Sequence, residues 1–232
     1  MVVKHFRRTL EFGQIIGIDF KESVDMNCTN LDGSTNDLYN QFNAGINSSK
    51  SSYLNRIKEI FAIEKEKLRL RDSKEVIERI FKKEMLYNIE REKLLFLSLE
   101  ELQEKTLGIN PLVNIYESDW KWFDNDPFRG MFDLKEILNT EKSDHYFLLE
   151  KTGTSDALLD SNVFESPLTE YQYFLLQLFE EPKKVKDVIT EFIKVFEVSS
   201  VKEKEELLVL TENQIRELIF KRFILIPDII PI

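Results

Sequence analysis

The stretch from Leu54 to Leu107 contains neither proline nor glycine, and this feature constrains the fold of the chain most strongly. Within it, apolar residues recur at intervals of three and four, the spacing that places side chains on one face of a helix. Glutamates alternate with lysines and arginines between them, as on solvated helix faces with ion pairs. The pattern predicts two or three helices over residues 53–107. The apolar positions that set it are Leu54, Ile57, Ile60, Phe61, Leu68, Val76, Ile77, Ile80 and Phe81.

Composition narrows the class of protein further. The chain has 232 residues, of which 42% are hydrophobic and 32% charged, so it is neither disordered throughout nor built for a bilayer. Its apolar runs reach four or five residues, against about 20 for a membrane-spanning helix. No signal peptide is visible at the start, and a single cysteine, Cys28, agrees with a reducing compartment. These features predict a cytoplasmic protein.

The residues that could carry chemistry are few. His5 and His145 are the two histidines, and neither has a neighbour at metal-ligand spacing. Cys28 lacks a nearby histidine or basic cluster that would lower its pKa. The chain has no glycine-rich phosphate loop, and its acidic residues do not match a calcium loop. We therefore expect a non-enzyme with no metal and no cofactor.

Two segments outside the helical region have different characters. Residues 1–52 are expected to be irregular, with a short strand over Gln14–Phe20 and a flexible loop over Asn43–Ser52. Residues 108–165 are expected to be a connector rich in acidic and aromatic residues, and they include both tryptophans. Within this connector we expect a short helix over Phe132–Leu138 and a short strand over His145–Glu150. Much of the net charge of −10 lies in this connector.

The segment 166–232 has the clearest organisation. A helix is predicted to open at Ser166–Glu170, a second to span Lys183–Phe196, and a third to begin at Thr211 after a charged connection. A short strand, Phe223–Pro227, follows and stops at proline. Three short helices followed by a strand form the order of a winged helix. The whole chain is therefore predicted to be mainly α within the α+β class, with a helical N-terminal and central part and a C-terminal winged-helix-like domain.

The same segment resembles a known family of peptide-recognition modules. Three stretches carry the likeness: the helix Leu168–Leu176, the second-helix start Glu181–Val188, and the junction Leu218–Leu225. They resemble the PqqD-like winged-helix modules, also called RiPP recognition elements, which serve as accessory subunits of peptide-modifying enzymes. Members usually have a glycine before the final strand, where this chain has Phe223.

The resemblance implies that a leader peptide adds a strand to the wing sheet and packs against the third helix. Main-chain hydrogen bonds then supply affinity, and alternate side-chain pockets supply specificity. On this hypothesis the residues that line the groove are Ile215, Ile219, Phe223 and Ile224. The alternative is that these four residues are core residues of a small helical domain.

Nucleic acid is a poor partner for this chain. An acidic chain repels a polyanion, and the charged residues around the third helix sum to only +1. These residues are Glu212, Arg216, Glu217, Lys221 and Arg222.

The sequence favours a non-catalytic accessory protein that binds a peptide or a partner enzyme as a heteromer. We expect no nucleic-acid or membrane partner. Trp120, Trp122 and Phe128 are candidates for a second partner-binding surface, although the tryptophans could instead fill a core between domains. Two alternatives remain: an acidic regulatory protein of the antitoxin, immunity or anti-regulator type, and, less favoured, a winged-helix transcription regulator.

Overall fold

In the computed structural model the described residues are 5–20, 31–71, 77–122, 133–156, 161–196 and 200–227. They form two compact units. The N-terminal unit comprises Met1–Ser73 and Glu117–His145, and the C-terminal unit comprises Lys74–Tyr116 and Tyr146–Ile232. The described part is mainly helical with small antiparallel sheets, which confirms the predicted mainly-α, α+β class. No helix in this part is both long enough and apolar enough to cross a bilayer.

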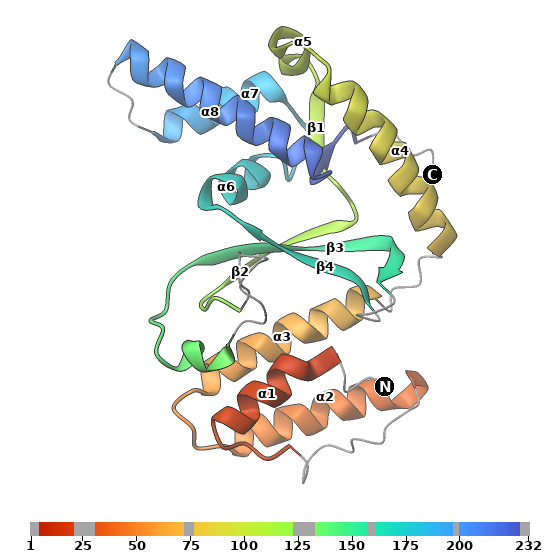
Figure 1. Cartoon of the computed structure of the whole chain (residues 1–232), viewed down its shortest axis with the longest axis vertical. Coiled ribbons are helices and arrows are strands. Elements are labelled where there is room, and N and C mark those ends of the chain that lie inside the picture. The colour runs from red at the N-terminus through yellow and green to blue at the C-terminus, as the bar shows by residue number, and fades with distance from the viewer. Residues whose placement is uncertain are drawn as a thin grey trace. The chain divides into compact units, whose positions relative to one another are not determined.

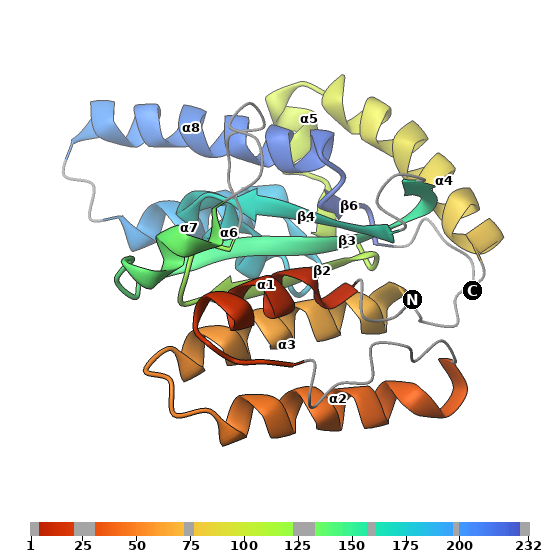
Figure 2. The ribbon, with the colours of Figure 1, turned by 60° about the horizontal axis from the view of Figure 1, so that its bottom comes forward.

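Among its described residues, the N-terminal unit has three helices and a 3-10 turn. Helix α1 (Arg7–Ile15) and helix α2 (Leu31–Ser48) both pack against α3 (Leu54–Arg71), and the three lie side by side in Figure 2. The 3-10 helix η2 (Leu134–Leu138) packs against α1 and confirms the short helix expected there. Three phenylalanines, Phe6, Phe42 and Phe61, meet in the core with ring centroids 4.9 to 5.4 Å apart.

Two expectations for the first 52 residues were wrong. The segment predicted as a strand over Gln14–Phe20 instead contains the end of α1 and a turn. Gly17, with φ of 80°, reverses the chain there, and the amide of Ile18 donates to the carbonyl of Gly13 at 2.8 Å. The loop predicted over Asn43–Ser52 is helical as far as Ser48. It stays helical because Phe42 and Ile46 continue the buried stripe of α2.

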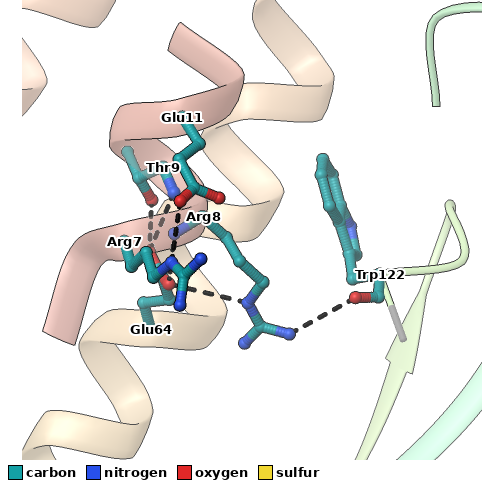
Figure 3. Close-up of polar contacts among 6 residues, drawn as sticks. All are labelled: Arg7, Arg8, Thr9, Glu11, Glu64 and Trp122. Atoms are coloured by element: carbon teal, nitrogen blue, oxygen red, sulfur yellow. Dashed lines mark hydrogen bonds and ion pairs between the residues drawn. The ribbon is translucent and has the colours of Figure 1, made fainter. Parts of the chain in front are cut away.

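A buried carboxylate joins α3 to the first turn of α1. Glu64 of α3 accepts hydrogen bonds from the amides of Arg8 and Thr9 at 2.9 and 3.0 Å, and from the Thr9 hydroxyl at 2.7 Å (Figure 3). These are the amides that a helix start leaves without intrahelical acceptors. The Arg8 guanidinium also lies 3.5 Å from Glu64. Burial raises the pKa of Glu64, while Arg8 and the bonds from Thr9 oppose that rise.

Five helices belong to the part of the C-terminal unit that the structure describes. They are α4 (Ile77–Leu95), α5 (Leu99–Gln103), α6 (Glu170–Leu178), α7 (Val185–Val195) and α8 (Val201–Phe220) (Figure 1). With α3, the helices α4 and α5 confirm the helices predicted over residues 53–107. Reciprocal side-chain and backbone hydrogen bonds open α5 between Ser98 and Glu101, and open α6 between Thr169 and Gln172.

Two predicted helix starts were misplaced. Ser166 and Pro167 are not the start of α6, because they belong to strand β4 and pair with β3. Thr211 is not a cap, because α8 already begins at Val201 behind the capping box of Ser200 and Glu203. Thr211 is instead buried mid-helix, where its hydroxyl donates to the carbonyl of Leu207 at 2.7 Å.

Two three-stranded sheets complete the described fold. One has the order β5 (Lys183–Lys184), β1 (Thr106–Ile109), β6 (Ile224–Leu225), with β1 antiparallel to both neighbours. The other has the order β2 (Val113–Ser118), β3 (His145–Asp156), β4 (Ser161–Leu168), and β3 confirms the strand predicted from His145. The final strand predicted near Phe223 is confirmed as the short β6.

The turn between α8 and β6 contains an unusual backbone conformation. Arg222 has φ of 63°, the one non-glycine residue with positive φ in the described part of the chain. The amide of Phe223 donates to the carbonyl of Leu218, which closes a helix end that usually carries glycine at this point. Asn110 fixes the turn, because its Nδ2 donates to the Arg222 carbonyl at 2.8 Å and its amide donates to the Phe223 carbonyl at 2.9 Å.

The Arg222 conformation leads to a prediction about stability. Replacing Arg222 by alanine or by glycine removes its ion pair with Glu150 in both cases. Glycine alone adopts the left-handed conformation without steric cost. Arg222→Gly should therefore be more stable than Arg222→Ala by about 1 kcal/mol in urea unfolding. An alanine variant as stable as the glycine variant would contradict this account.

The Glu64 site leads to a second prediction. Glu64→Ala leaves two amides and a hydroxyl without their acceptor, so it should lower the free energy of unfolding by about 3 kcal/mol. The neighbouring pair of Arg7 and Glu11, also drawn in Figure 3, is 2.7 Å apart but exposed. Glu11→Ala is the matched control and should cost about 0.5 kcal/mol or less. Equal losses in the two variants, measured by urea unfolding, would show that Glu64 does not hold α1.

Candidate functional site

Exposed apolar side chains are distributed unevenly between the two units. In the part of the chain that the structure describes, every large hydrophobic residue that is exposed belongs to the C-terminal unit. Where such residues gather, exposed apolar surface marks sites of protein interaction. The residues are Met85, Leu86, Ile89, Phe96, Phe164, Tyr171, Phe174, Val195, Val201, Val209, Leu210 and Phe220.

One group of these residues borders a pocket between α6 and α7, which we call the aromatic pocket. Its volume is about 240 Å³, and its lining is mostly apolar. Tyr171 and Phe174, about 40% exposed, lie on α6, and Tyr171 stacks on Phe196 with centroids 5.6 Å apart. The space suits one large apolar side chain, since pockets for drug-sized ligands measure roughly 300–1,000 Å³. The lining residues are Glu170, Tyr171, Phe174, Gln177, Leu178, Phe192, Val195 and Phe196.

The aromatic pocket lies in an acidic part of the chain. Between Lys151 and Lys183 there is no lysine or arginine, and this interval includes all of α6. Glu170 is the one charged residue in the lining of the aromatic pocket, so a cationic partner segment would meet attraction there. The acidic residues of the interval are Asp156, Asp160, Glu165, Glu170, Glu180 and Glu181.

A second pocket, bordered by α5, α7 and α8, has the opposite charge; we call it the lysine pocket. Its volume is about 490 Å³, and its floor is aliphatic, with Ile189 only 4% exposed. Lys186, Lys194 and Lys204 line it, accompanied by the carboxylate of Glu205. Lys186 and Lys184 hold Glu104 at 2.8 and 2.9 Å. The other lining residues are Gln103, Thr190, Ile193, Val201 and Leu208.

A third pocket contains an ion-pair cluster. Arg222 lies 3.0 Å from Glu150 of β3 and 3.9 Å from Glu84 of α4. Burial raises the pKa of Glu150, the guanidinium of Arg222 opposes the rise, and Glu84 adds to it. Because the arginine is engaged by the carboxylates beside it, this cluster ties the α8–β6 turn to β3.

The four residues predicted to line a peptide groove lie in the core of the C-terminal unit. Ile215 and Ile219 of α8 have no exposed surface, and Phe223 and Ile224 are 2% and 1% exposed. In this conformation they present no open groove, and their burial agrees with the alternative that they are core residues.

The tryptophans predicted as a partner surface are also buried, within the N-terminal unit. Trp120 is 7% and Trp122 is 1% exposed, and Trp122 packs edge-on against Phe12 at 5.4 Å. Glu59 of α3 accepts from the Trp122 indole at 2.6 Å and from the Trp120 amide at 3.2 Å. Burial raises the pKa of Glu59, and these bonds oppose the rise. Phe128, the third predicted residue, lies outside the described residues.

Sequence reasoning did not identify the aromatic pocket, although one signal was available. Leu175 and Leu176 occupy the buried face of α6, and Phe174 lies outside it. Tyr171, Phe174 and Leu178 follow one another at spacings of three and four and form a second apolar side. A helix with apolar residues on two sides has more apolar surface than one core contact covers.

The described residues hold no group of three or more metal-binding side chains. His145 contacts the Ser143 hydroxyl at 3.0 Å, and burial lowers its pKa. Comparisons with protein-family models, with curated proteins and with solved structures find no match for this chain.

The clamp on Glu104 gives a prediction about pH. Hydrogen bonds from Lys186 and then Lys184 lower the pKa of Glu104 to about 2, from an ordinary value of 4.5. The stability that this clamp contributes is therefore fully present above pH 4.5 and is lost as the pH falls toward 2. Carbon-13 NMR titration should give a Glu104 pKa near 2, and Lys186→Gln should raise it toward 4.5. Lys202→Gln, which changes a lysine paired elsewhere with Glu206, should leave the Glu104 pKa unchanged.

Proposed function

We propose that this protein is a non-catalytic accessory subunit that binds a peptide or protein partner through its C-terminal unit. One specific form is the partner of a peptide-modifying enzyme to which it presents a precursor's leader. The aromatic pocket carries the proposal, because exposed aromatic side chains around an apolar hollow are the usual anchor points of protein interfaces. With its single cysteine, we place the protein in the cytoplasm.

We infer that the C-terminal unit is a winged-helix-like module with one strand supplied from earlier in the chain. Support comes from the order α6, β5, α7, α8, β6, which is that of a winged helix up to the wing. In the sheet, β1 lies between β5 and β6, where the returning strand of a wing would lie. This arrangement supports the likeness to PqqD-like modules in layout.

The place of docking differs from the one that the resemblance implies. The residues of α8 and β6 that would contact a leader peptide are buried, whereas Tyr171 and Phe174 of α6 are accessible. The partner segment that suits the aromatic pocket is apolar and basic, because the chain around α6 carries only acidic charges. We therefore propose that an apolar side chain of the partner enters the pocket and that its lysines or arginines face the acidic interval.

Charge also argues against the winged-helix transcription regulator. Helix α8, which would be the recognition helix, has three basic and five acidic residues. Arg216 of this helix pairs with Glu212 at 2.9 Å and donates to the carbonyls of Leu95 and Leu97. It is therefore engaged within the protein and is not positioned to neutralise phosphate.

The acidic regulatory protein remains the second candidate, favoured by the same acidic interval. An antitoxin, immunity protein or anti-regulator would cover a folded basic partner, whereas an accessory subunit would bind a short segment. Binding of an isolated peptide at the aromatic pocket separates the two.

Fluorescence anisotropy with synthetic peptides tests this proposal. A fluorescein-labelled 12-residue peptide of leucine and lysine should bind the full chain more tightly than one of leucine and glutamine. Phe174→Ser should weaken the leucine–lysine peptide about tenfold, since it truncates an anchor side chain of the pocket. Phe96→Ser is the matched control, because Phe96 is 90% exposed and lies outside the pocket. Equal binding by both peptides, or no effect of Phe174→Ser, would overturn the proposal.

A further inference from the structure

We infer that the lysine pocket is a second docking site, which takes an acidic and apolar segment of the same partner. The inference rests on the proposed function and adds the chemistry of a second contact. Lys194 and Lys204 are exposed and have no ion-pair partner among the described residues. The aliphatic floor of Ile189, Ile193 and Leu208 lies beside them.

The charges around this pocket select an anionic segment. Lys194 and Lys204 are cations without a described partner, Lys186 is already bound to Glu104, and Glu205 is the single carboxylate in the lining. The excess of positive charge would attract carboxylates, and the aliphatic floor would bury the apolar side chains between them.

The positions of the two lysines favour a segment with more than one acidic residue over a small amphiphile with one headgroup. Lys194 lies on α7 and Lys204 on α8, so the pocket offers a cation on each of two helices. A segment with two acidic residues can supply one carboxylate to each lysine.

Helix α7 connects the two sites. Phe192, Val195 and Phe196 face the aromatic pocket, while Ile189 and Lys194 line the lysine pocket. The two linings share no residue, so each can be altered alone. A partner with a basic apolar block and an acidic apolar block would contact α7 on two sides. The order of these blocks in its sequence would determine the direction in which it binds across the two pockets. Two linked contacts also bind more tightly than either alone.

The test uses the full chain and three labelled 12-residue peptides, of leucine with glutamate, lysine or glutamine. The glutamate peptide should bind more tightly than the glutamine peptide, and less tightly in 500 mM than in 50 mM salt. The double variant Lys194→Gln, Lys204→Gln should weaken the glutamate peptide about tenfold and leave the lysine peptide unchanged. Phe174→Ser should weaken the lysine peptide about tenfold and leave the glutamate peptide unchanged. Lys202→Gln, a lysine of α8 outside the pocket, should change neither.

Each contrary result has a separate meaning. If the lysine peptide binds at the aromatic pocket but the glutamate peptide does not bind, this inference fails and the proposed function stands. If the glutamate peptide binds equally well to the double variant, the lysine pocket is not its site and the inference fails. Dodecanoate could also displace the glutamate peptide, and Lys194→Gln alone could abolish dodecanoate binding. This result would show that the pocket takes a small amphiphile and not a peptide, and the inference would fail. If none of the three peptides binds, the proposed function fails as well.

Discussion

The C-terminal unit depends on the side chain of Asn110. This amide group is 1% exposed, donates to the Arg222 carbonyl and accepts from the Leu112 amide at 3.0 Å. It thereby joins the end of β1 to the turn that follows α8, over more than a hundred residues of sequence. Since β1 is the middle strand between β5 and β6, this contact ties the centre of that sheet to the turn at the end of α8. A polar side chain in a core whose nitrogen and oxygen both have hydrogen-bond partners specifies one arrangement in a way that apolar contacts do not.

The acidic and basic residues of the C-terminal unit are distributed unevenly along the chain, and the proposed function depends on this distribution. Around α6 the chain is acidic without interruption, whereas the side of α7 that faces α8 carries lysines. The net charge of −10 does not show this contrast between the chain around α6 and the lysines of α7. Under the proposed function, the two pockets form a pair that discriminates the direction of a bound segment. Apolar contact would supply most of the affinity, and charge would supply the discrimination.

Local signals in the sequence predicted much of the secondary structure. The apolar spacing of residues 53–107 predicted two or three helices, and the described part of this segment contains three. The wrong predictions share a cause: they fall where tertiary contacts, and not the local sequence, determine the secondary structure. Asn43–Ser48 has loop-like composition but remains helical through buried Phe42 and Ile46. Thr211 has the character of a cap, yet Ser200 with Glu203 provides a better one eleven residues earlier.

The candidate site was less predictable than the fold. Exposure of Phe174 depends on which side of α6 meets the core, and periodicity alone does not decide between two apolar sides. The resemblance pointed to Ile219 and Phe223, whose burial follows from the packing of α8 in this unit.

The position of β1 has a consequence for the growing chain. Thr106–Ile109 leaves the ribosome before either of its neighbours exists, because β5 and β6 both follow it in the chain. Until β5 is made β1 has two open edges, and until β6 is made it keeps one, which is the state in which strands pair wrongly. A partner that reaches the nascent chain early would meet an incomplete unit, so assembly with it must follow the synthesis of β6.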